Sequence, residues 1–216
     1  MDGLVVDTEH AWLKVEHDVA SSLGVPWGPE HQAALVGGSL EATSAYLASL
    51  ASVASPDLAL GEIAEQLLTG MVDQVRRFGA AERPGARRLI AEVRQAGVPS
   101  ALVSASYRVL VDAVLEATGL VFDVTVAGDE VPQTKPAPDP YLHAVESLGA
   151  DPRRCVALED SPNGLASAEA AGCVTIGVPN VVPLLPTGGR SIVTSLEELT
   201  VPSLAKIVAL NHVAGA

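Results

Sequence analysis

The sequence is poor in cysteine, in positive charge and in long apolar runs. Its two cysteines, Cys155 and Cys173, indicate a reducing compartment and argue against a disulfide framework. Lys and Arg number 13 against 26 Asp and Glu. Because nucleic acids and anionic membranes bind clustered positive charge, neither is expected as a partner. No apolar run reaches the ~18 residues needed to cross a bilayer, and no signal segment opens the chain. We therefore expect a cytoplasmic protein.

Several common catalytic patterns are also missing. No G-x-S-x-G elbow supports a Ser-His-Asp hydrolase, and the histidines show no spacing typical of metal ligands. Hydrophobic residues nevertheless make up 48% of the 216 residues, which is enough for a full core. The length allows one large domain or a domain with a sizeable insertion.

The hydrophobic pattern divides the chain into two kinds of segment. Residues 9–83 carry apolar residues at helical spacing, without the alternation typical of strands. From Pro84 onward the pattern alternates between helices and strands, the strands being expected at 97–104, 122–127, 155–158, 174–178 and 191–193. This predicts an α/β fold, with a Rossmann-like parallel sheet in residues 1–8 and 84–216 and helices on both of its faces. Residues 9–83 are expected to form an inserted all-helical cap.

Side chains suited to phosphate chemistry lie at the ends of these strands or soon after them. Asp2 follows the start of the chain, and Ser104 closes an apolar strand. Lys135 precedes a helix, where its ammonium can neutralise phosphate charge. Glu159 and Asp160 end another buried strand, and adjacent carboxylates in such a place need a compensating cation. Mg²⁺ fits this role because it prefers hard oxygen ligands.

These residues stand in four segments, MDGLVVDTE, ALVSAS, KPAPDPY and EDSPNG. In order and spacing the segments resemble the motifs of haloacid dehalogenase-like phosphatases. The match is to the helical-cap branch, which includes phosphoglycolate phosphatase-like enzymes and β-phosphoglucomutase. The resemblance implies a Mg²⁺-dependent phosphatase that hydrolyses a small phosphorylated metabolite through an aspartyl phosphate. Asp2 would be its general acid and base, and the backbone carbonyl of Asp2 would bind the metal.

The same resemblance assigns the other residues. Ser104, the N–H of Ala105 and Lys135 would hold the phosphoryl group. Asp160 would bind Mg²⁺, and Glu159 would support it.

These phosphatases open with a D-x-D-G motif, of which Asp2 and Gly3 match the last two residues and the first aspartate is missing here. In this family that aspartate is the nucleophile and ends a central apolar strand, and its position falls just before Met1. We expect Met1 to be an internal methionine taken as the start. The first core strand and the attacking carboxylate would then be missing from this chain.

Two alternatives stay open. A β-phosphoglucomutase-like transferase is disfavoured because Trp12 occupies the position of that enzyme's histidine. Leu40, which follows GGS at 37–39, replaces its phosphate-gripping arginine and cannot make bidentate contact with phosphate. The other alternative, a catalytically dead relative that binds a phosphorylated ligand, is motivated by the absent nucleophile. The sequence predicts neither the substrate nor the oligomeric state.

Overall fold

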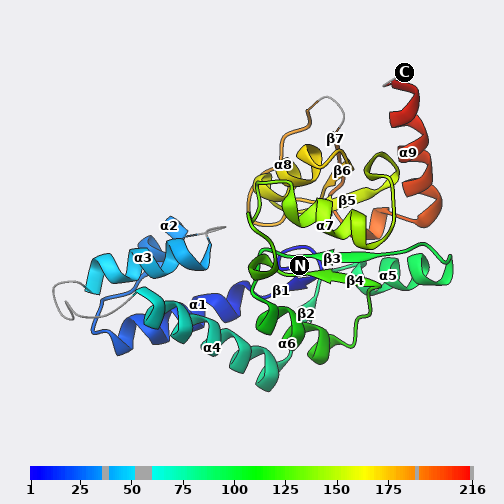
Figure 1. The fold of residues 1–216 in the computed structure, drawn as a ribbon. Helices are drawn as coiled ribbons and strands as arrows, with labels where there is room; N and C mark the ends of the chain where they lie inside the picture. The colour runs from blue at the N-terminus through cyan, green and yellow to red at the C-terminus, as the bar shows by residue number, and fades with distance from the viewer. Residues whose placement is uncertain (36–38, 52–59, 188–189, 215–216) are drawn as a thin grey trace. The chain divides into compact units, whose positions relative to one another are not determined.

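The structure is a computed structural model that describes residues 1–35, 39–51, 60–187 and 190–214. The chain divides into two compact units (Figure 1). One is Thr8–Ala80, and the other joins Met1–Asp7 to Ala81–Ala216. None of the described helices is long and apolar enough to cross a membrane.

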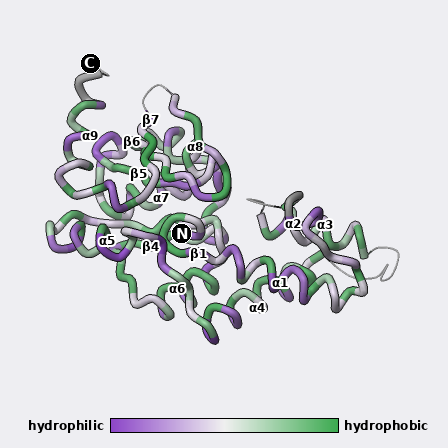
Figure 2. The backbone as a smooth tube through the Cα atoms, turned by 180° about the vertical axis from the view of Figure 1, so that it is seen from behind, coloured by the Kyte–Doolittle hydropathy of each residue, from purple (hydrophilic) through white to green (hydrophobic). Residues whose placement is uncertain are grey.

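The first unit consists of helices in the part that the structure describes. Its elements are α1 (Glu9–Ser22), α2 (Pro29–Leu35), α3 (Leu40–Ala51) and α4 (Leu60–Phe78). Helix α4 packs against both α1 and α3. It buries Ile63, Leu67, Met71 and Val75, which recur every four residues and so lie on one face. In Figure 2 the tube of α4 accordingly changes back and forth between apolar and polar colours.

The second unit contains all of the described strands, together with helices on the sheets. Its elements in chain order are β1 (Val6–Asp7), β2 (Ala81–Glu82), α5 (Ala86–Gln95), β3 (Ala101–Val103), α6 (Arg108–Thr118), β4 (Val124–Val126), η1 (Gly128–Glu130), α7 (Asp139–Ser147), η2 (Pro152–Arg154), β5 (Val156–Glu159), α8 (Pro162–Ala170), β6 (Val174–Gly177), β7 (Arg190–Ile192), η3 (Leu196–Glu198) and α9 (Val201–Ala214). The α/β fold class expected from the sequence is confirmed.

The parallel strands belong to two sheets. Strand β3 pairs with β4, and β5, β6 and β7 form the second sheet in that order. The short β1 and β2 pair antiparallel with each other. Among the described residues no strand joins β3 to β5. Helix α7 packs against β3, β4 and α8, and thereby links the two sheets.

Candidate active site

Lys135 connects the ends of the two sheets. It lies between η1 and α7, and its Nζ donates to the carbonyl of Val103, the last residue of β3, at 3.0 Å. The same ammonium forms an ion pair with Glu159, the last residue of β5. The side chains of Lys135 and Glu159 are only 8% and 6% exposed. Because both charges are buried, each depends on the other for compensation.

Tyr141 on α7 is the second partner of Glu159. Its hydroxyl donates to the same carboxylate oxygen that Lys135 contacts. Burial, followed by the charge of Glu159, raises the pKa of Tyr141 well above its ordinary value, so the hydroxyl remains a donor. The ammonium of Lys135 also lies 5.1 Å from the centre of the Tyr141 ring. Sequence reasoning missed this role, although Tyr141 closes the KPAPDPY segment.

Because Gly164 has no side chain, the carboxylate of Glu159 can lie against the first turn of α8. A Cβ at Gly164 would stand 2.0 Å from Oε2 of Glu159, much closer than two such atoms can approach. The N–H of Gly164 donates to the hydroxyl of Ser161, the N-cap of this helix, at 3.1 Å. The EDSPNG segment therefore combines a carboxylate, a helix cap and the glycine that makes room for the carboxylate.

Asp160 faces the segment that begins the chain. Gly3, with φ +75°, lies so close that a Cβ there would stand 2.0 Å from Oδ2 of Asp160. Burial raises the pKa of Asp160 to about 6, against the lowering effect of the α-amino group of Met1. The charges of Glu159 and Asp2 raise it as well. Asp2, which is half-buried, lies close enough to Asp160 for their charges to interact.

The residues around Asp160 fit a divalent cation in their chemistry. Asp160 is a hard oxygen ligand that is short of compensating positive charge, and Asp2 adds a second carboxylate nearby. Within the described ranges, no three His, Cys, Asp or Glu side chains gather into a metal-binding group. Glu159 is occupied by Lys135 and Tyr141. A cation here would thus rely on Asp160, on the nearby Asp2 and on backbone oxygen.

Ser104 is buried directly after β3. Its N–H donates to the carbonyl of Val126 at 2.9 Å, and its hydroxyl accepts from the N–H of Ser106 at 3.1 Å. Ala105 between them is exposed. Since Lys135 contacts the residue before Ser104, the structure brings these two predicted phosphate-binding residues together.

The two residues that disfavour a β-phosphoglucomutase-like transferase lie in the helical unit. Trp12 is on α1, and Leu40 is the first residue of α3. Gly37 and Gly38 lie outside the described residues. Cys155 and Cys173, in the other unit, are both free thiols.

Comparisons with known proteins agree with these motifs. The family model of the haloacid dehalogenase-like hydrolases matches residues 1–172. Protein CbbY of Rhodobacter capsulatus is 32% identical over 189 residues, which cover 83% of each chain. Hexitol phosphatase B of Escherichia coli K12 is 32% identical over 186 residues, covering 83% of this chain and 81% of that protein. A crystal structure of CbbY from Rhodobacter sphaeroides in complex with xylulose-(1,5)bisphosphate has a TM-score of 0.79 at 27% identity, covering 94% of this chain and 96% of that one.

Proposed function

Because the chain belongs to the haloacid dehalogenase-like hydrolase family, we propose that it is a phosphatase acting on a small phosphorylated sugar or sugar alcohol. The observation that carries this proposal is the buried Lys135, which Val103 and Glu159 hold at the strand ends. The names of the relatives support the substrate class, since one is a hexitol phosphatase and another was crystallised with a sugar bisphosphate.

The proposed reaction divides the work among residues of the core unit. Lys135 and the hydroxyl of Ser104 hold the phosphoryl oxygens and offset the charge that develops on them. Asp2 gives a proton to the leaving oxygen as its bond to phosphorus breaks, and later takes a proton from the water that attacks phosphorus. The attacking carboxylate is expected from the aspartate that the family places two residues ahead of Asp2, a position that this chain does not contain.

We propose that Mg²⁺ is held by the Asp160 carboxylate and the Asp2 carbonyl. The bound cation would supply positive charge to the phosphoryl oxygens. Glu159, assigned by the resemblance to support the metal, would do so indirectly, because its carboxylate anchors Lys135.

We assign the choice of substrate to residues 9–83, the proposed cap. Leu40 there lacks the donors that would grip a second phosphate, which favours hydrolysis over transfer between two positions of a sugar.

The test is phosphate release from a panel of phosphorylated sugars and sugar alcohols with Mg²⁺. The enzyme would be an N-terminally extended form that places Asp directly before Met1. We expect turnover that a chelator abolishes and that Lys135→Met lowers by at least about a hundredfold. Lys206→Met, at an exposed lysine of α9, is the matched control and should leave turnover unchanged. Absence of phosphate release from every ester by the extended form would refute the proposal.

A further inference from the structure

The loop after β3, which carries Ser104 and Ala105, is tied to the segment after β4. The N–H of Gly128 donates to the carbonyl of Ser106 at 2.9 Å, in addition to the bond between Ser104 and Val126. The segment after β4 continues through η1 to Lys135. The two groups of residues proposed to hold phosphate thus reside on two neighbouring loops.

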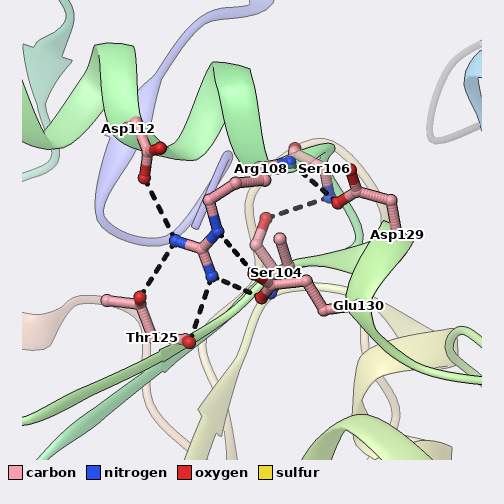
Figure 3. Close-up of polar contacts among 8 residues, drawn as sticks. Ser104, Ser106, Arg108, Asp112, Thr125, Asp129 and Glu130 are labelled. Carbon is pink, nitrogen blue, oxygen red and sulfur yellow. Dashed lines mark hydrogen bonds and ion pairs between the residues drawn. The ribbon is translucent and has the colours of Figure 1, made fainter.

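Arg108, the first residue of α6, directly follows the first loop, and its guanidinium reaches β4 and the segment after it (Figure 3). Its Nε donates to Glu130 at 2.8 Å, and one terminal nitrogen also binds Glu130. The Thr125 hydroxyl and carbonyl accept at 2.9 and 3.1 Å, and Asp112 accepts at 3.1 Å. These contacts occupy all five N–H donors that an arginine side chain has.

Two backbone contacts extend the same cluster. The N–H of Arg108 donates to Asp129 at 2.8 Å, and the N–H of Ala127 donates to Glu130 at 2.8 Å. Glu130 therefore receives donors from Arg108, which directly follows the loop of Ser104 and Ala105, and from the segment after β4. Because the fork of arginine is planar and its contacts are bidentate, this arrangement fixes direction as well as distance.

The geometry points to Arg108 as a positioning residue for the phosphate site. By binding Glu130 and Thr125, it holds the loop of Ser104 and Ala105 in register with the segment that leads to Lys135. This inference rests on the proposed function, because it assumes that these residues bind a phosphoryl group. Arg108 itself need not touch the ligand, since its donors are all used within the cluster.

The exposure of the Arg108 and Glu130 side chains distinguishes a positioning role from a general contribution to the stability of the fold. The side chains of Arg108 and Glu130 are 27% and 38% exposed, and ion pairs with such exposure contribute little to folding. A positional role predicts a large effect on ligand binding together with a small effect on unfolding. A merely structural role predicts the reverse.

The chain offers a matched control in Arg87. This arginine forms a similar fork with Glu82 and donates to the carbonyl of Thr118 at 2.6 Å. Its contacts involve neither of the two loops.

The experiment compares Arg108→Met, Arg108→Lys and Arg87→Met in the full chain. Inorganic phosphate affinity would be measured by calorimetry with Mg²⁺ present, and the urea midpoint by circular dichroism. Hydrogen exchange of the Ser106 and Gly128 amides would report on the loops. We expect Arg108→Met to weaken phosphate binding roughly tenfold or more and to speed the hydrogen exchange of both amides. Arg108→Lys should recover little of the affinity, because lysine keeps the charge and loses the fork.

Arg87→Met should leave phosphate affinity and the hydrogen exchange of both amides unchanged. It should shift the urea midpoint about as much as Arg108→Met does. Equal phosphate affinity in Arg108→Met and Arg87→Met would overturn the positioning role. Absence of phosphate binding by the unaltered chain would overturn the role of Arg108 in binding, whereas the proposed function is decided separately by phosphate release from the extended form. In that case faster amide exchange in Arg108→Met would still mark the loop contact as structural.

Discussion

Glu16 places a carboxyl group in the interior of the helical unit, where its charge opposes folding. The residue lies on α1 and is only 8% exposed. Burial, followed by the charge of Glu9, raises the pKa of Glu16 from 4.5 to about 7. Because the pKa of Glu16 is higher in the folded state than in the unfolded state, folding favours the protonated carboxyl. The folded protein therefore has its full stability below the unfolded-state pKa and loses this part of it as the pH rises through the folded-state pKa of about 7.

The magnitude follows from the two pKa values. Their difference corresponds to about 3 kcal/mol if it is expressed in full, and to about 2 kcal/mol if water reaches part of the side chain. We therefore expect Glu16→Gln to raise the free energy of unfolding by about 2 to 3 kcal/mol above the folded-state pKa. Near the unfolded-state pKa the variant and the unaltered protein should be equally stable, because Glu16 is then protonated in both states.

The assay is urea unfolding of both proteins across this pH range. Taking the difference between them at each pH cancels the titration of all other groups. Glu65→Gln, at an exposed glutamate of α4, is the matched control for the loss of a carboxylate from a helix of the same unit. A Glu16→Gln effect that is constant with pH, or a variant less stable at high pH, would show that the buried charge is compensated and refute the reasoning.

Two further predictions concern the surroundings of Glu159. Tyr141→Phe removes a buried donor to a charged group and should cost about 1.5 to 3 kcal/mol in urea unfolding while weakening phosphate binding. Tyr46→Phe is the control, because it removes a hydrogen bond to the ring of His31 rather than to a carboxylate. Equal losses of unfolding free energy and of phosphate affinity in the two variants would contradict the special role of Tyr141. Gly164→Ala should cost about 1 to 3 kcal/mol because its Cβ meets Glu159 at 2.0 Å. Gly61→Ala in α4, with open space around it, should be neutral or stabilising, and the reverse order would refute the argument.

The parts of the fold that could be predicted are those with a clear hydrophobic period. The strands β3, β5 and β6 are short apolar runs between helical patterns. Strand β3 lies inside the expected range 97–104, and β5 and β6 overlap the expected ranges 155–158 and 174–178. Helix α9 was not predicted, because its apolar residues are spread around the helix and no face stands out. The pair β1 and β2 was missed because two-residue strands are too short to show alternation.

The assignment of the candidate residues to a phosphate site stays a prediction, but part of their grouping follows from the order of the strands. Parallel strands end at one edge of a sheet, so residues following β3 and β5 could be expected to lie together. The partners of Glu159 could not be predicted from its neighbour Asp160. Successive residues along an extended chain point to opposite sides, and the two carboxylates accordingly separate. Glu159 turns to Lys135 and Tyr141, whereas Asp160 turns to Gly3.

This separation sets the charge balance that the site presents to phosphate. Lys135 can contact a phosphoryl oxygen, but together with its partner Glu159 it adds no net charge to the site. Asp2 and Asp160 are acidic and add negative charge to the site. A phosphate ester carries a charge of about −1.5 to −2 near neutral pH, and neutral donors such as Ser104 can orient it without balancing it. The described side chains alone would therefore repel the ligand. A divalent cation beside Asp160 reverses this balance, which is why we expect phosphate release to require Mg²⁺ even though Lys135 is intact.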